Sequence, residues 1–436
     1  MNRIEKWKWV FLSFFFGFGI ILQAQSFNLT YFKNVIDTLS SPSFAGRGYI
    51  DDGMEKAGIY IRDEFKRNGL KSFTSNYAQP FTFPIHIIED AQLTINGQSL
   101  HYGIDFIVKP SSHSISKSNL PFYKFDTNAY VESFQSKGKT KDFILKDHQL
   151  QQGHHIVLPP LKTTVDSIQR YYKQWANIYG KDEKQNQAIF RFTSDKLISS
   201  LSQRSSSVSE FIISDKFYSN QFQIDDFLIQ ANFNQAFKAS NYIGYVEGKN
   251  NDSVVVISAH YDHLGKVGQT IFPGASDNAS GTAMLLSLMK HYVKYPPKHK
   301  TVFMVFAAEE AGILGAQYYV DHPLFPLEKI KFLVNLDILG SGEDGIQVVN
   351  GKIFRKEFEQ LVKLNQKKQA LKQIKTRGES CNSDHCPFYQ HGVPSFFIYT
   401  LGGKGFYHDP NDTAENLDLS YSEKVFNLLQ NFISSL

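Results

Sequence analysis

From residue 241 onward, short apolar runs alternate with amphipathic segments. The apolar runs are continuous and rich in β-branched residues, which is typical of strands buried on both faces. Strands are therefore predicted at residues 253–259 (SVVVISA), 301–308 (TVFMVFAA), 331–336 and 395–399. The segments between them repeat apolar positions at helical spacing, which predicts helices at residues 281–292 and 311–320. Strands alternating with helices indicate an α/β fold, a three-layer sandwich with a mostly parallel central sheet.

The first half of the chain has a different pattern. Residues 52–69 repeat apolar positions at roughly helical spacing and end in Asn68-Gly69, which predicts one helix. Between residues 79 and 237, short apolar or alternating runs are separated by stretches rich in Ser, Lys and Gln. Strands are predicted there at residues 92–95, 155–158, 188–192 and 211–213. We therefore expect a β-rich insert at 79–237 that interrupts a larger domain formed by 26–78 and 238–436.

Residues 1–25 have the pattern of a secretory signal peptide. Three cations, Arg3, Lys6 and Lys8, precede the apolar run 10–22, and a small residue, Ala24, follows. The alternative is an uncleaved anchor, but the run is short for the roughly 20 residues that span a bilayer. No cysteine lies near the cleavage region, which argues against a lipoprotein anchor. The pattern predicts an exported protein, periplasmic or secreted, without a stable membrane anchor after cleavage.

The amino-acid composition argues against one class of function, nucleic-acid binding. The chain has 436 residues, of which 42% are hydrophobic and 20% charged, as in an ordinary globular protein. Its formal net charge is +4, and the Lys and Arg residues are scattered along the sequence. Because nucleic-acid binding requires a clustered basic face, no nucleic-acid partner is expected.

Acidic and histidine side chains follow the predicted strands of the second half. His260 closes the first strand, Glu309 and Glu310 follow the second, and Asp337 closes the third. Open α/β sheets place their sites at these carboxyl ends. Asp262, two residues after His260, faces the same way and is suited to accept the other N–H of that imidazole. Adjacent glutamates point to opposite sides, so one can bind a metal while the other acts as a general base.

Two more candidates lie in loops. Asp277 stands among small residues before a predicted helix, where it is either a helix cap or a carboxylate that bridges two cations. His408 lies in a turn-rich loop and could equally be a plain surface residue. Two histidines and three carboxylates suit a borderline metal such as zinc. The expected ligands are His260, Asp277, Glu310, Asp337 and His408.

Five segments in order, SAHYDHLG, GASDNASGTAML, FAAEEAGILGA, NLDILG and SDHCPF, resemble the M28 family of di-zinc aminopeptidases. The resemblance spans about residues 253–412 and, more loosely, 47–70. It implies two zinc ions per chain, with His260 and Asp337 on one ion and Asp277 bridging both. It assigns Glu310 and His408 to the other ion, and Glu309 as the general acid/base. The implied substrates are peptides with a free amino terminus.

The resemblance also raises questions about neighbouring residues. Some family members carry a tyrosine shortly before the SDH segment to stabilise the oxyanion, and this chain has none there. Tyr407, just before His408, is the candidate oxyanion donor; otherwise it is a wall residue. His385 is expected to be a hydrogen-bonded structural histidine near the site. The insert occupies the position where related proteins often carry a protease-associated domain.

Other interpretations remain open. Cys381 and Cys386 are the only cysteines, and they either form a disulfide or stay as two thiols. A glutaminyl cyclase-like zinc enzyme would bind a single ion, and a non-catalytic binding protein on the same fold would lose ligands or the base. A carboxypeptidase would need an arginine for the substrate carboxylate, and Arg355 and Arg377 are the candidates in this half of the chain.

Overall fold

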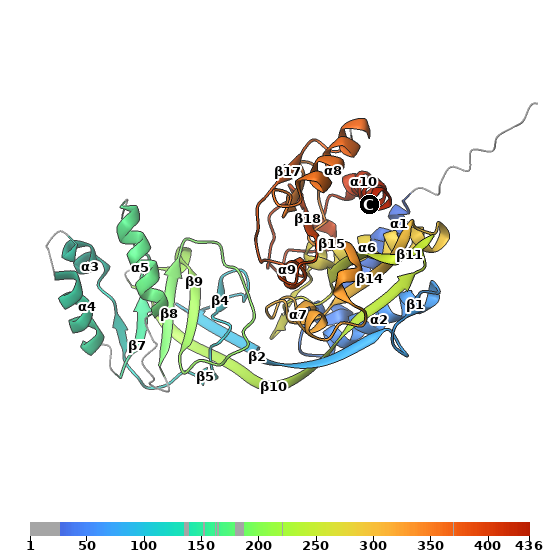
Figure 1. Cartoon of the computed structure of the whole chain (residues 1–436). Helices are drawn as coiled ribbons and strands as arrows, with labels where there is room; N and C mark the ends of the chain where they lie inside the picture. Colours follow the sequence, from blue (N-terminus) through green and yellow to red (C-terminus); the bar gives the residue numbers. More distant parts are fainter. Residues whose placement is uncertain are drawn as a thin grey trace, which may run out of the picture.

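The structure, a computed structural model, describes residues 27–134, 139–150, 153–161, 163, 165–178, 187–219, 221–368 and 370–436. The predicted signal peptide lies outside the described residues. Two lobes are apparent in Figure 1, and the long strands β2 and β10 run from one into the other. The larger lobe contains both ends of the described chain. The smaller lobe is built from residues between those two strands.

An eleven-stranded mixed sheet forms the centre of the larger lobe. Its main strand order is β17-β16-β18-β15-β11-β14-β10-β2-β3, and β1 and β5 also pair with β10. The central strands β14, β11, β15 and β18 are mutually parallel. The bounds are β1 Lys71–Ser72, β2 Ala78–Ile95, β3 Gln98–Ser99, β5 Ile115–Ser116, β10 Ile224–Val246, β11 Asn250–His260, β14 His299–Phe306, β15 Ile330–Leu336, β16 Gly345–Val349, β17 Ile374–Thr376 and β18 Ser395–Leu401.

Helices cover both faces of this sheet. Along β11, Val255 and Ile257 face one core while Val254 and Val256 face the other, because successive side chains of a strand point to opposite sides. The first core is covered by α1 Leu29–Leu39, α2 Gly53–Arg67, α6 Gly281–Lys294, α8 Arg355–Lys368 and α10 Ser422–Ser435. The second is covered by α7 Leu314–Asp321 and α9 His385–Gln390. The predicted three-layer α/β sandwich is confirmed.

The helix termini follow the sequence signals. Asn28 caps α1, since its side chain accepts a hydrogen bond from the Tyr31 amide at 2.9 Å. Helix α2 ends at Asn68-Gly69 as expected, and Gly69 takes a left-handed φ of +71° that favours glycine. The apolar face of α2, which includes Ala57, Ile61 and Phe65, is buried in the first core.

The smaller lobe carries a five-stranded sheet in the order β4-β9-β8-β7-β6. Its strands are β4 Phe106–Val108, β6 Phe122–Lys124, β7 His155–Leu158, β8 Ala188–Thr193 and β9 Ser209–Ser214. The predicted strands of this region are present. Three helices that the sequence analysis did not predict lie in its polar stretches: α3 Thr127–Ser133, α4 Lys139–Leu150 and α5 Asp166–Ile178. In α5, Ile168 and Tyr172 are buried one turn apart.

Strands β2 and β10 connect the lobes. They pair antiparallel from Ala78↔Tyr242 to Ile95↔Ile224, with three register shifts on the way. The expected insert boundaries, 79 and 237, fall within these strands. The two lobes therefore share continuous hydrogen-bonded strands instead of meeting at flexible linkers.

Smaller elements complete the described chain. Strands β12 Gly265–Val267 and β13 Thr270–Phe272 pair with each other beside β2. The short helical turns are η1 Pro42–Arg47, η2 Asp215–Phe217, η3 Ala275–Ser280, η4 Leu327–Lys329, η5 Ala414–Asn416 and η6 Leu419–Tyr421. Within the described ranges, no helix combines the length and apolar character needed to cross a membrane.

Candidate metal centre

The ends of three adjacent parallel strands bring the candidate residues together. His260 is the last residue of β11, Asp337 follows β15 directly, and Glu309-Glu310 lie in the turn after β14. Because β14, β11 and β15 are neighbours that run in the same direction, their carboxyl ends meet at one edge of the sheet. The loop before α6 adds Asp277 to this edge.

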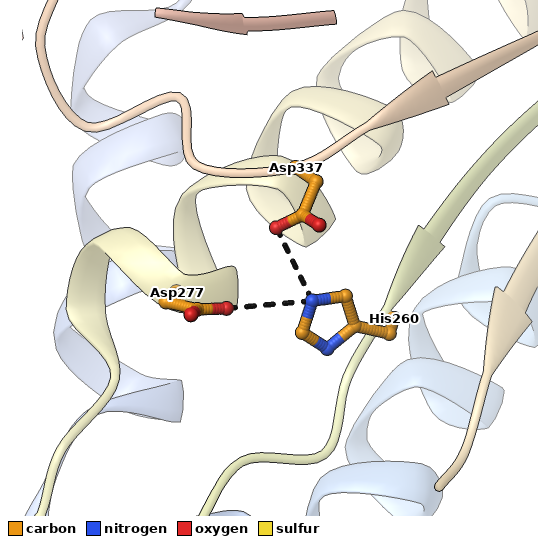
Figure 2. Close-up of side chains that lie close together, drawn as sticks. All are labelled: His260, Asp277 and Asp337. Carbon is orange, nitrogen blue, oxygen red and sulfur yellow. Dashed lines mark hydrogen bonds and ion pairs between the residues drawn. The ribbon is translucent and has the colours of Figure 1, made fainter. Parts of the chain in front are cut away.

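His260, Asp277 and Asp337 form the first group. The Nε2 atom of His260 lies 3.2 Å from Asp337 Oδ1 and 3.4 Å from Asp277 Oδ1, as Figure 2 shows. All three side chains are buried. The Nδ1–H of His260 donates to the main-chain carbonyl of Asp262 at 3.2 Å, which leaves the Nε2 lone pair directed at the carboxylates.

A second group lies on the other side of Asp277. The Nε2 atom of His408 is 3.4 Å from Asp277 Oδ2 and 3.1 Å from Glu310 Oε2. Its Nδ1–H donates to the carbonyl of Ser199 at 2.8 Å, so Nε2 is again the free nitrogen. His263 is also buried here, with Nδ1 2.6 Å from Glu310 Oε1.

The two adjacent glutamates face different groups. The Oε2 atom of Glu309 lies 4.0 Å from His260 Nε2, whereas Glu310 faces His408 and His263. Burial raises the pKa of Glu309 well above its usual value, and the Asp384 carboxylate raises it further against the opposing effect of His260. Burial also raises the pKa of Glu310, but His408 and His263 outweigh this effect and lower it to about 2.

This donor set fits metal ions. Among the described residues, the buried Nε2 atoms of His408 and His263 have no hydrogen-bond partner. Several carboxylates share the same buried space, which is costly unless cations compensate their charge. Neutral imidazole nitrogens and carboxylate oxygens are ligands that zinc accepts. Two clusters could each hold an ion, namely His260, Asp277 and Asp337, and His263, Asp277 and Glu310, with His408 beside the second.

Asp262 and Asp412 hold the site loops through main-chain amides. The Asp262 carboxylate accepts from the amides of Glu309 and Glu310 at 3.1 and 3.3 Å. It lies 3.9 Å from His260 Nδ1, so the expected carboxylate–imidazole hydrogen bond is replaced by one to the Asp262 carbonyl. The Asp412 carboxylate accepts from the amide of Asp277 at 3.1 Å. Burial raises the pKa of both Asp262 and Asp412 to about 6.

Arg47 lies beneath the site and is fully buried. Its guanidinium donates to main-chain carbonyls from three separate segments, those of Leu39, Tyr261, Pro273, Gly274 and Asp277. Burial lowers the pKa of Arg47 to about 10, while the nearby carboxylates act in the opposite direction. This single guanidinium thus joins the N-terminal segment to the loop that follows His260 and to the loop that carries Asp277.

A hydrogen-bond chain orients Asp337. Asn335 Nδ2 donates to Ser383 Oγ, and Ser383 donates to Asp337 Oδ2, each at 2.8 Å. The next residue, Asp384, is buried with both carboxylate oxygens lacking a hydrogen-bond partner among the described residues. Burial raises its pKa well above the usual range, with His260 opposing that rise.

His385 and Tyr407 border the centre. Nε2 of His385 donates to the Ser380 carbonyl at 3.0 Å, and burial lowers its pKa to about 4. The ring of Tyr407 stacks on His408 with centroids 3.8 Å apart, and the residue is 47% exposed. Burial of the hydroxyl raises its pKa, which keeps the phenol protonated. A disulfide joins Cys381, which precedes α9, to Cys386 in the first turn of α9.

Several residues of this arrangement were not predicted from the sequence, among them Arg47, His263, Asp384 and Asp412. His263 and Asp384 stand inside quoted motif segments, so their proximity to the site was a usable signal. Arg47 and Asp412 act on main-chain groups more than a hundred residues away, which no local pattern reveals.

Residues 241–433 match peptidase family M28. Aminopeptidase YwaD of Bacillus subtilis is 30% identical over 195 residues, which cover 41% of this chain and 40% of that protein. A probable leucine aminopeptidase of Trichophyton verrucosum is 27% identical over 220 residues, which cover 47% of this chain and 58% of that protein. The aligned regions thus span less than two thirds of either relative.

Solved structures extend the likeness to nearly the whole chain. A zinc aminopeptidase from Bacillus subtilis superimposes with a TM-score of 0.66 at 18% identity. The superimposed region covers 94% of this chain and 95% of the Bacillus chain. A peptidase M28 precursor from Shewanella amazonensis has the same TM-score at 15% identity, with 93% and 92% covered. These similarities show a common fold that includes the smaller lobe. Over residues 241–433, the chain is similar to peptidase family M28.

Proposed function

We propose that this protein is an exported zinc aminopeptidase that hydrolyses the N-terminal peptide bond of peptides with two metal ions. The position of Asp277 carries the proposal. Its Oδ1 atom faces His260 and its Oδ2 atom faces His408, each at 3.4 Å, as expected of a carboxylate that bridges two cations. In this proposal Asp337 completes the first set of ligands and Glu310 the second.

Bound zinc supplies Lewis-acid polarisation of the scissile carbonyl and lowers the pKa of the attacking water. The chain's own residues carry the proton. The raised pKa of Glu309 suits a carboxylate that accepts a proton from water and then passes it to the leaving amine. The amide of Glu309 is held by Asp262, which fixes the turn that presents this side chain. Tyr407, protonated and partly exposed beside His408, is positioned to donate to the developing oxyanion.

The positions of the arginines favour an aminopeptidase over a carboxypeptidase. A carboxypeptidase would need an arginine at the site to bind the substrate carboxylate, and neither candidate arginine is among the site residues described above. Arg355 lies on α8, exposed and paired with Glu359, and Arg377 is exposed after β17.

A cavity of about 100 Å³ next to Asp277 is suited to the first side chain of the substrate. Its wall combines Ile338, Phe406, Tyr407 and Leu417 with glycines and with polar residues such as Ser341 and Lys404. The apolar part of this wall favours a hydrophobic N-terminal residue.

The proposed activity is tested by which end of a peptide is cleaved and by whether cleavage depends on metal. Peptides with free or acetylated amino termini would be incubated with the protein before and after chelation, and the products identified by mass spectrometry. We expect stepwise removal of N-terminal residues from free peptides only, lost on chelation and restored by zinc. Release from the carboxyl end, or cyclisation of N-terminal glutamine without hydrolysis, would contradict the proposal.

Export rests on residues 1–25 and is tested separately. N-terminal sequencing of the protein recovered from periplasm or medium should give a mature chain that begins near residue 25. A chain recovered in the membrane fraction with Met1 intact would contradict cleavage.

A further inference from the structure

A loop of the smaller lobe reaches the candidate metal centre. This loop, residues 194–204 between β8 and β9, is called the insert loop below. Leu201 within it packs against the core of each lobe, and the Ser202 carbonyl accepts from the His86 amide of β2 at 2.7 Å. The insert loop is therefore anchored at the junction of the lobes.

The insert loop contacts one of the proposed metal-binding residues directly. Ser199 is buried, and its carbonyl accepts the Nδ1–H of His408 at 2.8 Å. Imidazole has two nitrogens, and fixing the proton on Nδ1 presents the lone pair of Nε2 to Asp277 and Glu310. The tautomer and ring orientation of His408 thus depend on a residue of the other lobe.

Two side chains of the insert loop hold the turns on either side of the site. Lys196 Nζ donates to the Gly405 carbonyl at 2.5 Å and to the Tyr407 carbonyl at 3.2 Å, in the loop that carries His408. Gln203 Nε2 donates to the Ala311 carbonyl at 2.7 Å, in the turn that carries Glu310. Both proposed ligands of the second ion are therefore carried by turns bound to the insert loop.

We propose that the insert loop is a positioning element of the metal site, with Lys196 and Gln203 as positioning residues. It acts on the ion bound by His408 and Glu310 and leaves the ion bound by His260 and Asp337 unaffected. This inference rests on the proposed two-metal function. Partners that orient metal ligands from behind are worth about 10- to 100-fold in metal affinity.

The test compares two double variants of the full-length mature protein. The test variant is Lys196→Met with Gln203→Ala. The control is Lys117→Met with Gln92→Ala, which removes a lysine bond to the Asp225 carbonyl and a glutamine bond to Asp90, both distant from the site. Zinc affinities would be measured by competition with a chromogenic chelator, and thermal unfolding would be followed without metal.

In the test variant we expect one zinc affinity to fall about tenfold and the other to stay within about twofold of wild type. The metal-free test variant should unfold at the same temperature as the metal-free control. The single variant Lys196→Arg should keep the zinc affinity of wild type, because a guanidinium can still donate to the carbonyls of Gly405 and Tyr407.

Three results would overturn the inference while the proposed function stands. They are unchanged zinc affinities in the test variant, an equal loss of affinity at both sites, and the same loss of affinity in the control. A wild-type protein that binds no zinc would overturn the proposed function and this inference with it.

Discussion

At the scale of single residues, surroundings give identical side chains different chemistry. Glu309 and Glu310 are consecutive and both largely buried, yet their pKa values move in opposite directions. Glu310 faces two imidazoles, which favour its ionised form, whereas Glu309 faces further carboxylates as well as His260. An ionised carboxylate is suited to bind metal, and one with a raised pKa is suited to exchange a proton.

Tyr407 is the residue whose proposed role is most easily isolated. Removing its hydroxyl in Tyr407→Phe keeps the ring stacked on His408 and removes only the proposed oxyanion donor. Loss of one such donor costs roughly 10²-fold in kcat, and we expect KM to change little. Steady-state kinetics on an aminoacyl amide provide the measurement, with Tyr389→Phe as the matched control. An unchanged kcat would make Tyr407 a wall residue.

His385 predicts part of the pH dependence of stability. Its pKa is about 4 in the folded state because of burial, against 6.5 when unfolded. Between these values only the unfolded state binds the proton, so the free energy of unfolding falls as the pH falls, by up to about 3 kcal/mol. In His385→Gln this loss between pH 7 and pH 5 should be smaller. Urea unfolding at both pH values checks this, with exposed His322→Gln as control; parallel losses in all three proteins would contradict it.

At the scale of elements, strand ends and loops are joined by buried polar groups. Arg47 links the segment before α2 to the loops after β11 and before α6, and Asp412 links the loop before α10 to the start of η3. Because these contacts are made to main-chain atoms, they hold the backbone of each loop in place. They do not depend on which side chains the loop residues carry.

The cost of losing Arg47 should be large. Arg47→Met keeps much of the buried volume but leaves several carbonyls without a donor, and each unsatisfied buried group costs about 1–3 kcal/mol. We expect at least about 3 kcal/mol lower free energy of unfolding in the metal-free protein. Denaturant unfolding gives the value, and Arg62→Met on the exposed side of α2 is the comparison. A loss below about 1 kcal/mol would show that water satisfies these carbonyls.

The sequence was sufficient to predict the parallel strands β11, β14, β15 and β18, because buried parallel strands are continuous apolar runs, and the ends of three of them carry the site. His260, Glu310 and Asp337 could be located in that way. Contacts made by main-chain atoms could not, since the Ser199 carbonyl meets His408 across 209 residues without any side-chain signature. The helices of the smaller lobe were missed because their apolar residues lie in stretches with many polar residues, which were interpreted as connections between strands.

At the scale of the whole molecule, β2 and β10 make the smaller lobe an extension of the main sheet. The site then lies where the sheet edge, the loops before α6 and α10, and the insert loop meet. Metal ions would hold these parts together by compensating carboxylates from several segments.

Metal removal should therefore lower the stability of the entire protein. A ligand present at 1,000 times its Kd stabilises the folded state by about 4 kcal/mol. For a chain of this size, chelation should lower Tm by roughly 5–10 °C, and zinc should reverse the shift. Calorimetry with and without chelator measures it, and an unchanged Tm would indicate that little metal is bound in the folded state.

The most direct measurement counts zinc and activity together in wild type and Glu309→Gln. If metal binding belongs to the histidines and the other carboxylates, both proteins should hold about two zinc ions per chain. Only wild type should cleave aminoacyl amides at full rate, with kcat in Glu309→Gln lower by at least about 10²-fold. One zinc ion or none in wild type, or full activity in the variant, would contradict a two-metal aminopeptidase with Glu309 as its proton carrier.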